Sequence, residues 1–356
     1  MALSAKSLRK AVVHPLLLNP SPASLQSTRL ALHVDGGGSS CSVYIASGCR
    51  VYKVQISMED STTVTTGKES LLIPVQAEVI HSSLVNRCPH RSEIQSVVLA
   101  EKDCNSGVIL GTVDSYGHLI VSRLDTSGED VERHTYSVLP RDCGIGEGSW
   151  AGMCFSPQHW STAAVARALC KSIDIYEQDV HIQCLRTLWN PGSLCFLSSS
   201  LSGNGSSSML AVAEGCQLTI WDLRTNYNGG CVQRICGTVG DCLYAVCSSF
   251  DGAIAAGGSD RTVTIYDPRR WSALKRWANC SKYEITGLAF SSLDSNHLYV
   301  QGVDYEVFCG QWKESRKAFS FRGDANWLGF GKSANVDILA GWSECGSIFV
   351  ADVVKE

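Results

Sequence analysis

The sequence repeats one pattern of two short strands joined by a tight turn, and this repetition limits the fold more than any other feature. The clearest copy runs from Asp251 to Arg270. In it the stretch Ala253 to Gly258 is small and apolar, as in a strand that is buried on both faces. After a turn, Val263 and Ile265 alternate with polar residues, which predicts a half-buried antiparallel strand. Two strands and a turn therefore form the repeating unit.

Copies of this unit recur along the chain. Tyr176, Trp221 and Tyr266 stand at equivalent places and are each separated by about 45 residues, the period expected for one four-stranded propeller blade. The copies that we identify are Arg29 to Met58, Ile94 to Asp125, Trp150 to Glu177, Met209 to Arg224, Asp251 to Arg270, Ile285 to Trp312 and Trp327 to Val353. Seven copies predict an all-β fold, a seven-bladed β-propeller of four-stranded antiparallel blades.

The connectors between copies each hold a short apolar run that can form the fourth, outermost strand of a blade, where one face meets water. In the first copy the run is Leu71 to Ile80; in later copies the runs are His181 to Leu188, Gly230 to Cys236, Ser272 to Ala278 and Lys317 to Phe321. The last copy has no fourth strand before Glu356, and a ring of blades with one open edge does not close. We expect Lys10 to Leu18 to supply it.

Two interpretations of the N-terminus stay open. In the first, residues 1–28 form an N-terminal segment with the closure strand, and residues 29–356 form the propeller. In the second, residues 1–34 target an organelle, because they contain basic residues and serines with no acid before Asp35. We expect the closure strand.

Composition narrows the range of partners and compartments. A net charge of -4 and the lack of basic runs interleaved with aromatic residues give no electrostatic footprint for nucleic acid. No apolar run approaches the length of a membrane span, so we expect no membrane partner. The 17 cysteines include Cys154, Cys195, Cys247 and Cys309, which fall where a strand needs a small apolar residue. Reduced thiols of this kind predict a cytoplasmic or nuclear protein.

The sequence contains no motif that assembles catalytic chemistry. It has no G-x-S-x-G, no P-loop and no H-E-x-x-H, and its nine histidines are dispersed. The glycine clusters at residues 35–38 and 144–148 do not lie between a strand and a helix, where a phosphate cradle would be. Cys88-Pro89-His90 is the nearest approach to a pair of metal ligands. We therefore expect no catalytic residues, no cofactor and no metal.

These repeats resemble the WD-repeat β-propellers. The dipeptide that gives the family its name is complete at Trp221-Asp222 and has a variant form at Tyr266-Asp267. No Gly-His pair precedes a blade, so we do not expect the family's Asp-His-Ser/Thr-Trp hydrogen-bond network. Asp114, Asp260 and Asp304 fall at the turn between the second and third strands, where an aspartate can accept hydrogen bonds from turn amides.

The resemblance implies a non-enzymatic scaffold for protein assemblies. Two successive copies end with the same acid, spacer and arginine, in Trp221-Asp222-Leu223-Arg224 and Tyr266-Asp267-Pro268-Arg269. This is similar to the tandem box by which some WD-repeat proteins dock on the adaptor of a cullin-RING ubiquitin ligase as substrate receptors. Asp260 occupies the expected upstream acidic position of the second box, whereas Gly215 stands there in the first.

The boxes also have a purely structural interpretation, in which each arginine pairs with the preceding aspartate or with a neighbouring loop. Tryptophans beside basic residues, at Trp271, Trp277 and Trp312, could mark an interface, but we expect them to pack between blades under a cationic neighbour. The alternative functions are thus the ligase substrate receptor and an enzyme with its site in the propeller channel. Fold alone does not choose among them.

Overall fold

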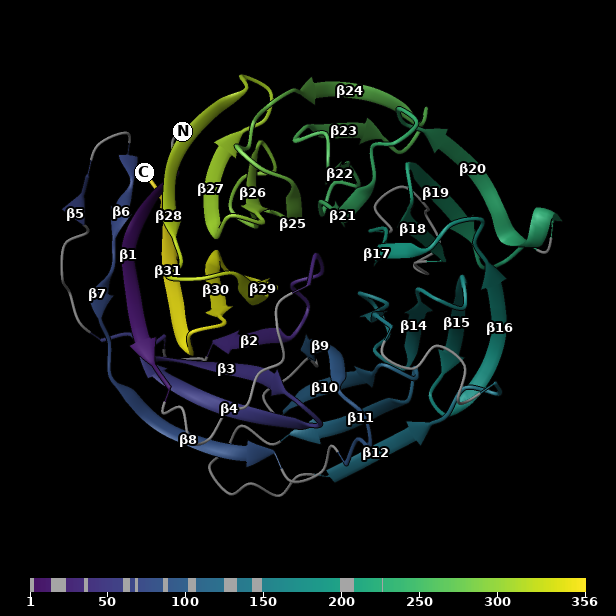
Figure 1. Ribbon diagram of the computed structural model, residues 1–356, viewed down its shortest axis with the longest axis horizontal. Helices are drawn as coiled ribbons and strands as arrows, with labels where there is room; N and C mark the ends of the chain where they lie inside the picture. Colours follow the sequence, from purple (N-terminus) through teal and green to yellow (C-terminus); the bar gives the residue numbers. More distant parts are fainter. Residues whose placement is uncertain are drawn as a thin grey trace.

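The computed structural model describes residues 3–13, 24–34, 38–59, 65–67, 70–85, 89–101, 107–124, 133–142, 149–198, 208–225 and 227–356. Seven antiparallel sheets stand in a ring around a central axis (Figure 1). In six of them the strands follow one another in sequence, from the innermost to the outermost. The predicted all-β, seven-bladed propeller is confirmed.

We number the blades in chain order by their first strand. Blade 1 comprises β2 (Leu30–Val34), β3 (Ser40–Ser47), β4 (Arg50–Ser57) and β8 (Val79–Val85). Blade 2 comprises β9 (Ile94–Glu101), β10 (Val108–Asp114), β11 (Leu119–Leu124) and β12 (Arg133–Val138). Blade 3 comprises β13 (Ala151–Phe155), β14 (Thr162–Arg167), β15 (Ser172–Glu177) and β16 (Val180–Arg186). Blades 4 and 5 comprise β17 (Pro191–Phe196), β18 (Met209–Glu214), β19 (Gln217–Asp222) and β20 (Cys231–Cys236); and β21 (Leu243–Ser248), β22 (Ile254–Gly258), β23 (Val263–Asp267) and β24 (Ser272–Trp277).

Blades 6 and 7 complete the ring. Blade 6 comprises β25 (Ile285–Phe290), β26 (His297–Gly302), β27 (Glu306–Gln311) and β28 (Arg316–Arg322). Blade 7 takes β29 (Trp327–Lys332), β30 (Ile338–Ser343) and β31 (Ser347–Lys355) from the end of the chain and β1 (Leu3–Val12) from its beginning. A short 3-10 turn, η4 (Tyr227–Gly230), precedes β20.

The closure strand exists, but it begins and ends earlier than we predicted. β1 pairs antiparallel with β31 from Leu3 opposite Lys355 to Val12 opposite Ser347, with a register shift between Ala5 and Ser7. The predicted strand overlaps β1 only in its first three residues, and residues 14–18 lie outside the described part of the chain. Because an outer strand tolerates polar residues, the more apolar run from Lys10 to Leu18 does not identify the segment that pairs with β31.

The long excursion of blade 1 also differs from our prediction. The outer strand of blade 1 is β8, and only Val79 and Ile80 of the run from Leu71 to Ile80 belong to it. The earlier residues of the run form the short strands β6 (Leu72–Ile73), which pairs with β5 (Thr65–Thr66), and β7 (Val75–Gln76), which pairs in parallel with β1. Figure 1 shows these strands outside β1, so β7 covers an edge that would otherwise remain open.

Each core layer is shared by two neighbouring blades. The second strands are buried along their whole length in β10, β22, β26 and β30. Close packing leaves no room at Gly258, where an added methyl group would overlap the carbonyl oxygen of Cys242. Among the described residues no helix has the length and apolar character needed to cross a membrane.

The seam at β1 gives a direct test of ring closure. Leu8 is 2% exposed and packs in one cluster with Phe319, Trp327 and Phe349, whereas Val12 on the same strand is 53% exposed. We expect Leu8→Ala to lower the free energy of unfolding by about 2 to 5 kcal/mol, because it leaves a cavity in this cluster. Val12→Ala should cost less than about 0.5 kcal/mol. Denaturant unfolding of both variants measures the difference, and equal losses would contradict the packing of β1.

Candidate interaction face and central cavity

The two ends of the ring carry different loops. Neighbouring strands of a blade are antiparallel, so the loops after the first and third strands lie at one end, which we call the lower face. The turns between the second and third strands, and the connectors between blades, lie at the other end, the upper face. The C-terminal ends of five inner strands, β13, β17, β21, β25 and β29, converge on one cavity, so these blades share one orientation.

The first arginine box lies on the lower face of blade 4. Trp221 is buried, and its Nε1 donates a hydrogen bond to Thr219 Oγ1 at 3.0 Å. Arg224 turns back on Asp222: its Nε and Nη2 donate to the two carboxylate oxygens at 3.0 and 2.9 Å. This fork lowers the pKa of Asp222 and is the structural pairing that we weighed against docking. The guanidinium still has a side-chain exposure of 62%.

The second box lies at the equivalent place in blade 5, but its arginine is arranged differently. Asp267 accepts a hydrogen bond from the backbone amide of Arg269 at 2.8 Å, and the Arg269 side chain is exposed. Tyr266 is half-buried against blade 4. Blades 4 and 5 are adjacent through β17 and β21. The two arginines are therefore brought to the same face of neighbouring blades.

Asp260 does not join the second box. It lies in the turn before β23, on the upper face, whereas Arg269 follows β23 on the lower face, roughly 17 Å away along a five-residue strand. Its carboxylate accepts a hydrogen bond from the Thr262 amide at 3.1 Å and pairs with Arg276 at 3.3 Å. The structure thus assigns Asp260 to its own turn.

Two exposed aromatic side chains lie on the same face as the two boxes, one beside the central cavity and one in an outer loop. Tyr227, in η4 after the first box, is 79% exposed, and Phe250, in the loop after β21, is 75% exposed. Both loops belong to the lower face. Neither residue can be predicted from the sequence pattern, because an exposed aromatic residue in a loop follows no periodicity. Together with Arg224 and Arg269 they form what we call the lower-face patch.

A central cavity of about 730 Å³ opens within the ring. The described residues around it are mainly small, hydroxyl-bearing or aromatic, and the charged one among them is Lys332. Ser27 and Thr28 also line it, because the segment before β2, purple in the centre of Figure 1, runs into the middle of the ring. Ser27 Oγ donates to Gln301 Oε1 at 2.7 Å, and Thr28 Oγ1 accepts a hydrogen bond from Trp150 Nε1 at 3.2 Å.

Lys332 belongs to a buried polar cluster between blades 6 and 7. Its Nζ donates to Ser292 Oγ at 2.5 Å and lies 3.5 Å from Asp337 Oδ1, while burial lowers its pKa. Asp337 is fully buried and accepts hydrogen bonds from the Ser292 amide at 2.7 Å, from Tyr299 Oη at 2.8 Å and from Ser291 Oγ. The cation and its partners therefore tie the two blades together at the cavity wall.

Three of the cysteines that we expected at strand positions do lie in strands, and they also line this cavity. Each is the last residue but one of an inner strand: Cys154 in β13, Cys195 in β17 and Cys247 in β21. Burial raises the pKa of all three thiols, that of Cys195 to about 12, so they are protonated at neutral pH. Cys309 is fully buried in the core, as predicted. The cysteines that the structure describes are free thiols.

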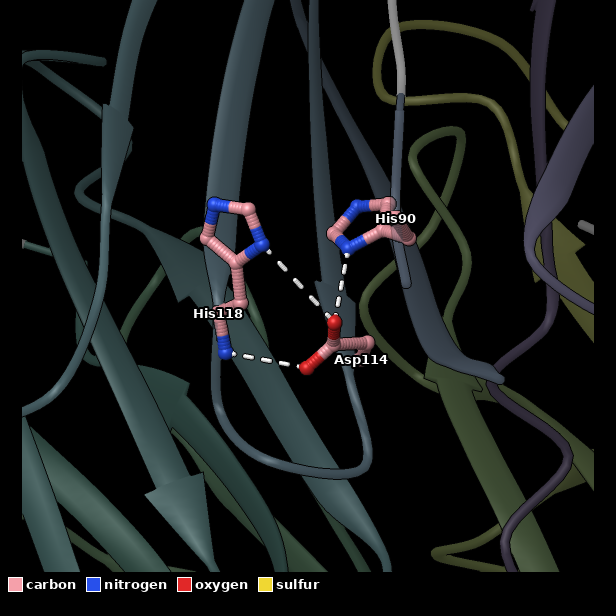
Figure 2. A group of neighbouring side chains, drawn as sticks. All are labelled: His90, Asp114 and His118. Atoms are coloured by element: carbon pink, nitrogen blue, oxygen red, sulfur yellow. Dashed lines mark hydrogen bonds and ion pairs between the residues drawn. The ribbon is translucent and has the colours of Figure 1, made fainter. Parts of the chain in front are cut away.

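A histidine cluster that we did not predict lies on the upper side of blade 2. His90 precedes β9, Asp114 ends β10, and His118 precedes β11 (Figure 2). His90 Nδ1 is 3.2 Å from Asp114 Oδ2, and its Nε2 is 2.8 Å from Thr112 Oγ1. We did not expect an Asp-His-Ser/Thr-Trp network, but Asp114, His90 and Thr112 form its first three members. Ser122 occupies the strand position that corresponds to Trp221 of blade 4, so the tryptophan is missing.

The turn aspartates behave in part as predicted. Asp114 Oδ1 accepts hydrogen bonds from the amides of Tyr116 at 3.0 Å and His118 at 3.1 Å, and Asp260 accepts one amide bond. Asp304 Oδ1 is buried without a hydrogen-bond partner in the described part of the chain. Burial opposes the ionisation of Asp114, but its bonds with His90 and the turn amides hold its pKa below the usual value. Burial lowers the pKa of His118.

The tryptophans beside basic residues pack between and within blades, as predicted. Trp277 is 8% exposed, and its ring lies 5.6 Å from that of Phe308 in an edge-on arrangement. Trp312 is equally buried, and Lys313 Nζ lies 5.2 Å from its ring centre. Trp271 is half-buried against blade 4. Of the glycine clusters at residues 35–38 and 144–148, only Gly38 belongs to the described part of the chain.

No protein-family model fits the sequence, and no curated protein is significantly similar to it. The function must therefore be argued from the residues and their geometry.

The Lys332–Asp337 pair allows a stability test. In Asp337→Asn a buried cation loses its counter-charge, so we expect a loss of about 3 to 5 kcal/mol in the free energy of unfolding. Asp352→Asn is the matched control, since Asp352 pairs at 3.4 Å with the exposed Lys6 and should cost no more than about 1 kcal/mol. Denaturant unfolding measures both variants.

The double variant Lys332→Met/Asp337→Asn should recover part of the loss, because it removes the unpaired cation. Equal losses for Asp337→Asn and Asp352→Asn would show that the cluster does not hold blades 6 and 7 together.

Proposed function

We propose that this protein is a non-enzymatic scaffold of the WD-repeat type that binds other proteins through its lower-face patch. The observation that carries the proposal is the exposure of Tyr227 and Phe250 on the same face as two exposed arginines. Tyrosine and arginine are enriched among the residues that dominate binding energy at protein interfaces. The loops that carry the patch are anchored at the ends of paired strands. The entropic cost of ordering them on binding is therefore small.

We propose a reducing compartment, cytosol or nucleus, as the place of action. The described cysteines are free, and several are buried as small apolar residues, which suits a chain that is not stabilised by disulfides. The alternative of organelle targeting concerns residues 1–34, and part of that segment, Leu3–Val12, is paired within blade 7.

A second candidate within the same class is a substrate receptor of a cullin-RING ubiquitin ligase. The specific observation in its favour is that Arg224 and Arg269 lie on the same face of adjacent blades, as docking of one adaptor on two boxes requires. A partner carboxylate could compete with Asp222 for the guanidinium of Arg224, which is mostly exposed.

The scaffold proposal predicts that partner binding depends on the lower face. We expect Tyr227→Ala combined with Phe250→Ala to lose captured partners, since truncating two interface anchors costs at least about 2 kcal/mol, or more than tenfold in affinity. Leu169→Ala with Val239→Ala is the matched control, because both side chains are exposed on the upper face. Affinity capture with quantitative mass spectrometry measures the difference. Equal capture by all proteins would overturn the proposal.

The receptor candidate predicts recovery of the cullin adaptor in a pull-down. Wild type should recover it, and Arg224→Ala with Arg269→Ala should recover at least tenfold less at an unchanged melting temperature, because both side chains are exposed. If wild type recovers no adaptor, or if both proteins recover it equally, the receptor candidate fails while the scaffold proposal stands.

A further inference from the structure

The histidine cluster of blade 2 has the composition and spacing of a metal site. His90 Nδ1 and His118 Nδ1 lie 3.2 and 3.8 Å from the same oxygen, Asp114 Oδ2. One ligand atom of each of the three residues lies within 4.8 Å of those of the other two. Figure 2 shows both imidazole rings directed at that oxygen. In a tetrahedral zinc site with bonds of about 2.1 Å, neighbouring ligand atoms are about 3.4 Å apart. The two nitrogen–oxygen separations, 3.2 and 3.8 Å, bracket this value.

The atoms behind the three ligand atoms are already held in place. The other carboxylate oxygen of Asp114 accepts hydrogen bonds from two turn amides, so Oδ2 is the oxygen that faces the two imidazoles. His90 Nε2 lies 2.8 Å from Thr112 Oγ1, and His118 Nε2 lies 2.6 Å from Ser137 Oγ. Partners of this kind fix the ring orientation and the tautomer of metal-binding histidines.

A hydrogen-bonded histidine–aspartate pair explains only part of this arrangement. It accounts for His90, but His118 Nδ1 lies 3.8 Å from Asp114, which is too far for a hydrogen bond, although its ring faces the carboxylate. Thr112 Oγ1 donates to the Ile120 carbonyl oxygen at 3.3 Å, so it can accept the Nε2 proton of His90. In the absence of metal, His90 Nδ1 donates to Asp114 Oδ2. Zinc would take the place of that proton, with the Nε2 proton of His90 then donated to Thr112 Oγ1.

We propose that His90 Nδ1, Asp114 Oδ2 and His118 Nδ1 bind one Zn²⁺ ion, with the fourth position open to water. Two imidazoles and one carboxylate are a known ligand set for zinc, and three protein ligands leave one position free. His90 and Asp114 are buried, whereas His118 is 15% exposed, so the ion enters from the side of His118. The ion would join the connector before β9 to the turn between β10 and β11.

Blade 3 provides an internal comparison. Asp174 there pairs with His181 Nε2 at 3.2 Å, but its second partner is Arg167, whose Nη2 lies 3.0 Å from the carboxylate. A guanidinium has no lone pair to offer a metal. The same acid–histidine pair with an arginine in place of the second imidazole is therefore expected to bind no zinc.

The test is calorimetric titration of Zn²⁺ alone into metal-free wild type, His118→Gln and His181→Gln. We expect one equivalent to bind wild type and His181→Gln equally, and His118→Gln to bind at least about 10- to 100-fold more weakly. Exposed thiols such as Cys49, Cys236 and Cys345 add a background that is common to all three proteins. Binding that is equal in wild type and His118→Gln, or no binding by wild type, would overturn the proposal.

A spectroscopic titration guards against a folding defect in the variant. Zinc added to wild type labelled with ¹⁵N in its histidine rings should shift the Nδ1 signals of His90 and His118 and leave those of His181 unchanged. If the ring signals that move belong to other histidines, the ion binds elsewhere and the assignment is wrong. This readout does not depend on partner binding, so it is independent of the proposed scaffold function.

Discussion

The antiparallel pairing of β1 with β31 is the interaction on which the whole ring depends. Every blade buries its two faces against its neighbours, so the ring has no stable free end. β1 contributes to both interfaces of blade 7: Leu8 packs in the cluster shared with blade 6, and Ala11 packs in the cluster shared with blade 1. Loss of this strand would therefore expose an edge and thin two core layers at once.

The same closure fixes how the chain reaches the centre of the molecule. β1 lies toward the rim of blade 7, but β2 is the innermost strand of blade 1, so the connection between them has to run inward. At its described end, Ser27 donates a side-chain hydrogen bond to Gln301 of blade 6, and the Ser27 carbonyl accepts one from the backbone amide of Phe330 in blade 7. The next residue, Thr28, accepts a hydrogen bond from Trp150 at the start of blade 3. The connection thus links blade 3 to blades 6 and 7, with which blade 3 shares no interface, and it occupies space that would otherwise belong to the cavity.

The sequence predicts the inner strands well and the outer ones less well, for a physical reason. β22 and β23 match the predicted strands within one residue, because a buried strand must be apolar and a half-buried one must alternate. β1 carries Lys6, Arg9 and Lys10, and the Leu71 to Ile80 run is more apolar than the strand that forms the rim of blade 1. Which segment pairs as the outermost strand of a blade depends on chain geometry and topology, and these produce no periodic pattern of side chains in the sequence.

The two sites differ in the same way. Trp221 to Arg224 and Tyr266 to Arg269 are continuous stretches, so their repetition shows in the sequence, whereas Tyr227 and Phe250 join them only through the loop arrangement. The zinc ligands come from a connector, the end of one strand and the start of the next. His90 and His118 meet because β9 and β11 flank β10 in register, and no spacing rule for a metal motif describes that approach.

The position of the two proposed sites has a consequence for how they can act. The lower-face patch belongs to blades 4 and 5, and the histidine cluster lies at the opposite end of blade 2, so no blade interface is common to both. Coupling between distant sites requires an element with two alternative arrangements that both sites bias. The strands between them are packed in register and buried on both faces, which favours one arrangement. Zinc at blade 2 would therefore stabilise its own loops locally, and partner binding at blades 4 and 5 would be independent of it.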